Sequence, residues 1–335
     1  MDWVWLEARA PRKSAPATRA PAMDWSLSRF MRKPFRCPVH QQYSNFMYKL
    51  NLRTFFCCLT TLAVLVPGWI GVAAESIKYN PVTREVIEAR LGKYKGSDLQ
   101  REATLKQLFA EDGCVGEHLS EQPVKGAKLP NVVCVLPGSS DRVIIVGGHF
   151  DHVPDGDGVV DNWSGASLLP SLYEAIKREP RKHTYIFIGF TDEEKGEVGS
   201  RFYARQMTKE QVAATDAMVN MDTLGLAPTE VWTSHSDKNL IGALVYAARL
   251  LKVSVSGENV EAVGSTDSVQ FSERKIPSIT IHSLTQKTWD AKILHSSKDK
   301  ISAIRLDDYY ETYRLLAAYL AVLDKVLGGT AEGVH

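Results

Sequence analysis

Short apolar segments rich in β-branched residues alternate with segments of helical periodicity along most of this chain. The segments expected to be strands are 131–136 (NVVCVL), 142–146 (RVIIV), 184–190 (TYIFIGF), 217–221 (AMVNM) and 277–281 (PSITI). Apolar residues with helical spacing occupy 164–177, 238–251 and 306–326. Strands that alternate with helices, and that are apolar on both faces, predict an α/β fold, with a mostly parallel central sheet and helices on both of its faces.

Two of the helical segments allow a more specific prediction. In the last one, aromatic and aliphatic residues recur every three or four positions and form one apolar stripe, which we expect to face the core: Tyr309, Tyr313, Leu316, Tyr319, Leu320 and Leu323. In the segment 164–177, Pro170 lacks a backbone N–H, so we expect a kink or a shifted helix there.

The N-terminal part of the chain has the pattern of a secretory signal. Lys49 and Arg53 precede an apolar stretch at 55–73, which ends in small residues up to Ala74. We therefore expect a signal peptide at 47–74 and a secreted, or otherwise extracytoplasmic, domain at 75–329. Residues 1–46 are expected to be an unstructured leader or a misassigned start before Met47. The uninterrupted apolar core 55–66 is short for a membrane span of ~20 residues, so no stable membrane association is expected.

Charge and cysteine content limit the possible partners. Residues 75–335 carry 30 basic and 36 acidic side chains, without the basic face typical of nucleic-acid binding. Nucleic acid is therefore not an expected partner, and the sequence does not indicate an oligomeric state. This part keeps two cysteines, Cys114 and Cys134, which are either a disulfide or two buried free thiols.

Polar residues follow several expected strands at the point where each strand ends. In sheets of this class the ligand crevice lies beyond the carboxyl ends of the strands. His149 follows the strand 142–146, and Asp151 stands two positions later. A histidine that binds a metal usually donates its second N–H to a carboxylate or carbonyl, and Asp151 suits that task.

Acidic residues cluster in the next two segments. Asp161 lies in a Gly- and Asp-rich loop (DGDGVVDNWSG), which alone is typical of a turn followed by a helix N-cap. Glu193 and Glu194 follow the apolar strand 184–190. Carboxylates at a buried strand end are costly unless they bind a metal or act as acid and base.

Two further segments complete a candidate metal site. Asp222 follows the strand 217–221, and His295 begins the segment HSSKDKI. His149, Asp161, Glu194, Asp222 and His295 would suffice for two divalent ions that share one carboxylate. Sites with two metals ~3.5–4 Å apart are typical of hydrolytic enzymes.

This order of residues resembles the secreted zinc aminopeptidases of the M28 peptidase family. The resemblance covers about 131–301 and includes Gly199-Ser200-Arg-Phe-Tyr203 and Ser265-Thr-Asp267. It implies two Zn²⁺ ions bridged by Asp161, with His149 and Asp222 on one ion and Glu194 and His295 on the other. Glu193 would be the general base that takes a proton from the attacking water. The implied substrate is the N-terminus of a peptide or protein.

Several alternatives remain at this level. His282 competes with His295 as a ligand, but Asp299 and Ile301 after His295 fit the family pattern. Glutaminyl cyclases share the fold but keep one zinc, and degenerate binding domains lose ligands. A carboxypeptidase on the same scaffold, and manganese or cobalt in place of zinc, also stay open.

Overall fold

The computed structural model describes residues 77–328, except for the side chain of Val263. The predicted leader 1–46, the signal peptide 47–74 and the domain limits Glu75 and Gly329 lie outside the described residues. Within the described range, no helix is both long enough and apolar enough to cross a membrane.

The centre of the fold is an eight-stranded sheet with the order β1-β2-β4-β3-β5-β8-β6-β7. Its strands are β1 Leu119–Gln122, β2 Asn131–Leu136, β3 Val143–His149, β4 Thr184–Phe190, β5 Thr215–Met221, β6 Glu230–Val231, β7 Ser256–Gly257 and β8 Ser278–His282. The four central strands β4, β3, β5 and β8 are parallel. On one side β2 pairs antiparallel with β4, and β1 pairs antiparallel with β2. On the other side β6 pairs antiparallel with β8, and β7 pairs parallel with β6. The predicted mostly parallel sheet is confirmed.

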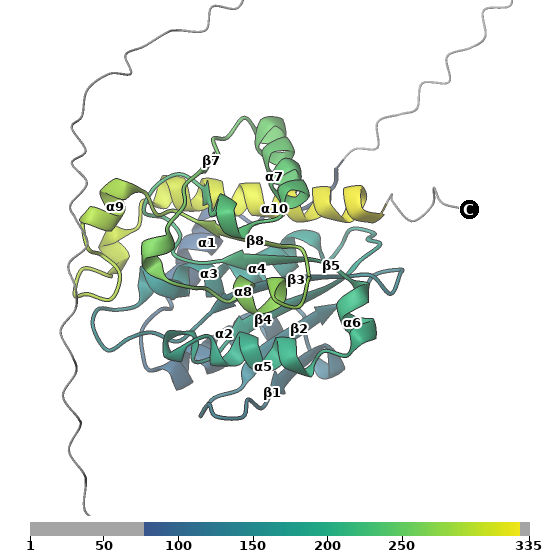
Figure 1. Ribbon diagram of the computed structural model, residues 1–335, viewed down its shortest axis with the longest axis horizontal. Coiled ribbons are helices and arrows are strands. Elements are labelled where there is room, and N and C mark those ends of the chain that lie inside the picture. The colour runs from purple at the N-terminus through teal and green to yellow at the C-terminus, as the bar shows by residue number, and fades with distance from the viewer. Residues whose placement is uncertain (1–76, 329–335) are drawn as a thin grey trace, which may run out of the picture. The chain divides into compact units, whose positions relative to one another are not determined.

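Helices cover both faces of this sheet (Figure 1). They are α1 Arg84–Leu91, α2 Asp98–Glu111, α3 Ser164–Ala166, α4 Leu168–Ile176, α5 Val198–Gln206, α6 Lys209–Ala214, α7 Lys238–Leu251, α8 Ser268–Ser272, α9 Gln286–Asp290 and α10 Leu306–Gly328. The larger core contains residues of α1, α2, α4, α7 and α10, and the smaller one residues of α5 and α8.

The alternation of side chains along each strand explains why two cores form. Ile144 and Val146 of β3 belong to the larger core, whereas Ile145 between them belongs to the smaller one. Successive side chains of a strand point to opposite faces, so a continuous apolar run supplies both cores at once. In Figure 1 the yellow helix α10 passes beside α7 on the side of the larger core.

Strand β3 is longer than predicted. It continues from Val146 through Gly147 and Gly148 to His149, which pairs with Phe190 of β4. A Cβ atom on Gly147 would lie 2.4 Å from the Phe190 ring, so the glycine permits close packing here. His149 is therefore the last residue of the strand and not part of the following loop.

The two specific helix predictions are confirmed. Helix α3 ends at Ala166 and α4 begins at Leu168, so the break falls shortly before Pro170. The tyrosine stripe of α10 is buried, and its hydroxyls are hydrogen-bonded to backbone groups. Tyr309 donates to Ser164 O, and Tyr319 donates to Leu240 O.

Cys114 and Cys134 form a disulfide, with their Cα atoms 6.3 Å apart. The disulfide joins the segment after α2 to strand β2. Of the two alternatives left open by the sequence, the structure therefore contains the disulfide and not two free thiols. The short strands β1, β6 and β7 and the helices α1, α2, α5, α6, α8 and α9 were not predicted.

Candidate metal centre

Three parallel strands bring the candidate residues to one edge of the sheet. His149 is the last residue of β3, and Asp222 directly follows β5. Glu193 and Glu194 lie in a short helical turn, Glu193–Lys195, just after β4. The carboxyl ends of parallel strands meet at one edge of the sheet, so His149, Glu193 and Asp222 become neighbours.

His149 lies at the centre of this group and is 1% exposed. Its Nε2 atom is 3.3 Å from Asp161 Oδ1, 3.7 Å from Asp222 Oδ1 and 3.9 Å from Glu193 Oε2. The opposite ring nitrogen, Nδ1, is 3.3 Å from Asp151 O and 3.5 Å from Asp151 Oδ1. Asp151 therefore lies beside the second nitrogen of the ring, as predicted.

Asp151 has a second task that the sequence did not indicate. Its two carboxylate oxygens accept the backbone N–H groups of Glu193, at 3.0 Å, and Glu194, at 3.2 Å. One buried carboxylate thus links the end of β3 to the turn that carries the paired glutamates.

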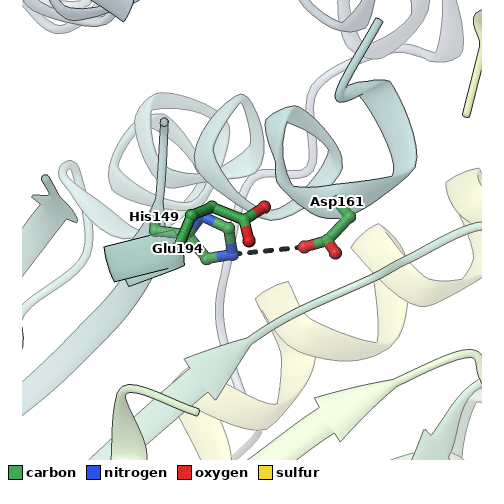
Figure 2. A group of neighbouring side chains, drawn as sticks. All are labelled: His149, Asp161 and Glu194. Atoms are coloured by element: carbon green, nitrogen blue, oxygen red, sulfur yellow. Dashed lines mark ion pairs between the residues drawn. The ribbon is translucent and has the colours of Figure 1, made fainter. Parts of the chain in front are cut away.

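Asp161 presents its two oxygens to two different histidines. Oδ1 is 3.3 Å from His149 Nε2, and Oδ2 is 3.2 Å from His295 Nε2. Figure 2 shows the Asp161 carboxylate opposite His149, with Glu194 beside the ring. This is the arrangement expected of a carboxylate that bridges two cations.

The loop that carries Asp161 is held by side chains from distant elements. Asp299 accepts the backbone N–H groups of Val159 at 2.8 Å, Val160 at 2.7 Å and Asp161 at 3.1 Å. From the sequence, Asp299 was predicted only as part of the family pattern after His295.

Asn162 provides a second set of contacts from the same loop. Its Nδ2 donates to Met221 O at 2.8 Å, and its Oδ1 accepts from Gly165 N at 2.9 Å and Thr223 N at 3.2 Å. The side chain thereby ties the Asp161 loop to the end of β5. Its position beside Asp161 was the only sequence signal for this role.

Glu194 and His295 form a close pair, with Glu194 Oε2 3.0 Å from His295 Nε2. Burial, and then repulsion by Asp161, raises the pKa of Glu194 to about 7. The pKa of His295 is raised to about 9 by the hydrogen bond of His295 with Asp161 and then by the charge of Glu194, despite partial burial. His295 is 56% exposed at the mouth of the site.

His282, the competing histidine, is engaged elsewhere. Its Nε2 is 3.1 Å from Glu258 O, and its Nδ1 accepts the N–H of Leu284 at 3.0 Å. Burial lowers its pKa to about 4. Both ring nitrogens have backbone partners, so His295 and not His282 meets Asp161 and Glu194.

Asp222 is fixed by hydroxyl groups. Thr266 donates to Asp222 Oδ2 at 2.7 Å, and Thr223 donates to Asp222 Oδ1 at 3.2 Å. Next to Thr266, the fully buried Asp267 has a pKa raised to about 7 by desolvation. The contacts of Thr266 were not predicted.

Glu193 has the most perturbed carboxyl group of the site. Burial raises its pKa to about 10 against the attraction of His149, with further contributions from Asp267, Asp222 and Asp161. So many neighbouring carboxylates repel one another unless protons or cations neutralise them.

The donor set fits divalent cations. Two groups of three ligand atoms each lie within 4.8 Å of one another, one from His149, Asp161 and Glu194 and one from His149, Glu193 and Asp222. His149 Nε2 and Glu194 Oε1 are buried and make no hydrogen bond. Imidazole and carboxylate are ligands that zinc accepts, and unsatisfied buried donor atoms indicate a missing partner.

An open pocket of ≈ 500 Å³, a volume that includes solvent at its mouth, leads to these residues. Asp161, Glu193, Glu194 and Asp222 line one part of it, and the apolar side chains come from Trp232, Val260, Leu284 and Leu294. A substrate can therefore reach the acidic group from solvent.

Residues 131–320, more than half of the chain, match the model of Peptidase family M28. The chain belongs to peptidase family M28. This confirms the resemblance drawn from the sequence. All seven predicted site residues lie at this centre, and their individual roles as ligands, partner or base remain predictions.

The curated relatives of this M28 chain include two aminopeptidases. It is 27% identical over 188 residues to aminopeptidase YwaD of Bacillus subtilis, covering 53% of this chain and 38% of that protein. It is 25% identical over 271 residues to aminopeptidase Y of Saccharomyces cerevisiae, covering 76% and 48%. The chain thus spans less than half the length of these relatives.

Solved structures share the fold. The LapA aminopeptidase of Legionella pneumophila matches with a TM-score of 0.63 and 21% identity, covering 72% of both chains. A glutaminyl cyclase from an Acidobacteriales bacterium matches with a TM-score of 0.60 and 16% identity, covering 74% of this chain and 97% of that one. Likeness at this identity establishes the common fold and does not separate the two reactions.

Proposed function

We propose that this protein is a secreted two-zinc aminopeptidase, which removes single residues from the N-terminus of peptides. The observation that carries the proposal is the orientation of Asp161, whose two oxygens face His149 and His295 separately. A monodentate ligand of one ion would not need both oxygens to be directed at different imidazoles.

The resemblance to the M28 family implies two ligand sets, and this orientation supports them. Asp161, His149 and Asp222 would hold one zinc ion, and Asp161, Glu194 and His295 would hold the other. When bound, zinc polarises the scissile carbonyl and lowers the pKa of the attacking water to ~7. Asp151, through His149 Nδ1 and the amides of Glu193 and Glu194, orients residues of both sets.

Glu193 is proposed as the general base. Its carboxylate lines the pocket, and its backbone is fixed by Asp151. In the metal-free protein burial raises the pKa of Glu193 to about 10, and cations bound beside it would lower that pKa and leave the carboxylate free to accept a proton. Glu193 would take a proton from water and return it to the leaving amine.

The pocket favours an N-terminal over a C-terminal substrate group. Four carboxylates line it, and none of the described lining residues is Lys or Arg. A carboxypeptidase needs a cation for the substrate carboxylate, commonly Arg. A substrate with a free α-amine needs no such cation, and the lone pair of its neutral amine is a ligand that zinc would accept.

Two features support secretion. Residues 47–74 have the pattern of a signal peptide. Cys114 and Cys134 are joined in a disulfide, and disulfides persist mainly in oxidising compartments. The proposed substrates are therefore extracytoplasmic peptides or proteins.

Three versions of one peptide test the direction of cleavage. The zinc-loaded protein should shorten the unmodified and the C-terminally amidated peptide from the N-terminus, and should leave the N-acetylated peptide intact. Mass spectrometry of the products identifies the removed residue. Equal cleavage of the free and the acetylated form, with loss of cleavage on amidation, would establish a carboxypeptidase.

Glutaminyl cyclase activity is the second candidate, because this chain covers nearly the whole length of a cyclase structure. A peptide with an N-terminal glutamine separates the two reactions. An aminopeptidase releases free glutamine, whereas a cyclase releases ammonia and leaves the peptide 17 Da lighter. His149 and Asp222, in place beside Asp161, favour the aminopeptidase.

A further inference from the structure

Arg101 is an arginine of helix α2 that lies outside the part of the chain matched to the family. It is 1% exposed. Its guanidinium donates hydrogen bonds to four main-chain carbonyls, those of Tyr94 at 3.0 Å, Phe150 at 3.5 Å, Gly158 at 2.9 Å, and Asp157. A buried guanidinium needs such partners because its desolvation is costly.

Three of the four carbonyls belong to the two backbone segments that carry the proposed ligands His149 and Asp161. Phe150 stands between His149 and Asp151, at the end of β3. Asp157 and Gly158 precede Asp161 in the loop that carries it. Arg101 therefore connects Phe150, which follows the proposed ligand His149, to the loop that carries the proposed ligand Asp161.

The Asp161 loop is held from two sides. Arg101 donates to its carbonyls at Asp157 and Gly158, while Asp299 accepts its amides from Val159 onward. The guanidinium carbon also lies 5.8 Å from the ring centroid of Trp163, at the end of the same loop. Removal of Arg101 would leave the carbonyls of Asp157 and Gly158 without these donors.

We propose that Arg101 is a positioning residue for the metal centre, which sets the Asp161 loop against the end of β3 and thereby strengthens zinc binding. This inference rests on the proposed two-zinc site. Among the described residues, the hydrogen bonds of Arg101 all go to backbone carbonyls and none to a proposed ligand side chain, so we expect it to act through the position of the backbone.

Charge and position make opposite predictions for this residue. A cation close to a zinc site repels the metal, so its removal on electrostatic grounds alone should strengthen zinc binding. If Arg101 positions the loop, its removal should weaken zinc binding. The sign of the change separates the two effects.

The experiment compares R101M and R101K with R90M in the full chain. Arg90 is a matched control, because it is another buried arginine and bonds with Ser171, Asp112 and Glu174 away from the metal centre. Zinc dissociation constants are measured by competition with a chromophoric chelator. Thermal unfolding of the zinc-free proteins reports the general loss of stability.

R101M should bind zinc about 10–100-fold more weakly than the wild type, as is usual when a supporting contact of a metal site is lost. R101K keeps the charge but not the planar guanidinium, so its zinc affinity should lie between those of the wild type and R101M. R90M should unfold at a lower temperature with unchanged zinc affinity. If R101M does not fold, R101K is compared with R90M in the same way.

If the wild type binds two zinc ions and R101M or R101K binds them equally or more tightly, the proposed role of Arg101 is wrong and the proposed function stands. An equal loss of zinc affinity in R90M would also overturn this role, because the effect would then be general destabilisation. Wild-type protein without bound zinc would overturn the proposed function itself, and this role with it.

Discussion

The carboxylate of Asp299 accepts the backbone N–H of Asp161 at 3.1 Å. The two residues are far apart in the sequence, and the contact places the proposed bridging ligand between His149 and His295. Asp299 is 1% exposed and comes from the segment that follows His295. The Asp299 side chain thus fixes the backbone of the proposed ligand Asp161, and it comes from the same segment as the proposed ligand His295.

The variant D299N should lose zinc affinity. Asp299 Oδ1 accepts the amides of Val159 and Val160, so an asparagine that keeps this oxygen turns its NH₂ group toward the Asp161 N–H. Two donors then face each other, and we expect zinc affinity to fall about 10–100-fold. D307N is the control, since Asp307 is 88% exposed. Chelator competition that gives equal affinities for both variants would show that the contact does not matter for the metal.

Exchange of the paired glutamates should have different consequences at each position. E193Q should keep its zinc and lose kcat by about 10²–10⁴-fold, as for a missing general base. E194Q should lose zinc, because Glu194 pairs with His295 at 3.0 Å. Elemental analysis and kinetics on the same samples decide the matter. Loss of zinc from E193Q, with zinc and activity retained in E194Q, would reverse the two assignments.

Zinc affinity should increase with pH. In the metal-free protein burial raises the pKa of Glu194 to about 7, and the contact with Asp161 raises that of His295 to about 9. Zinc binds the deprotonated groups, so binding releases protons wherever the pH is below these values. Each displaced proton weakens zinc binding by about tenfold per unit of falling pH. Calorimetry in buffers of different ionisation enthalpy counts the protons. A count of zero at pH 7 would contradict this charge arrangement.

Secreted protein should begin near Glu75. Ala74 ends the small-residue segment of the expected signal peptide, and cleavage there removes the apolar core 55–66. N-terminal sequencing and intact mass of exported material give the start directly. Material that retains residues 55–66 would instead indicate a membrane anchor.

The elements that carry the site were predictable because each has a strong local signal. The strand 184–190 is a continuous apolar run and was predicted to the residue. The end of β3 was misplaced because Gly147 and Gly148 carry no apolar signal, yet they pair with β4 through the backbone alone. The two-residue strands β6 and β7 are too short for any pattern to emerge.

The supporting residues could not be predicted in the same way. Arg101, Asn162 and Asp299 act mainly on backbone groups that only the folded chain brings near them. An arginine in an amphipathic helix, read from the sequence, is usually a solvated residue. The pairing of Cys114 with Cys134 stayed open for a similar reason, because spacing along a chain does not give the distance between two Cα atoms.

The number of zinc ions bound per active chain tests the two-zinc aminopeptidase proposal most directly. Metal-free protein is titrated with zinc, and elemental analysis is compared with the hydrolysis of a free-amine peptide, for the wild type and for D222N. Wild-type protein should bind two zinc ions when fully active, and D222N should bind fewer and lose activity, because Asp222 and His149 complete one set. A fully active chain with a single zinc ion, and a D222N variant of unchanged activity, would contradict the two-metal site.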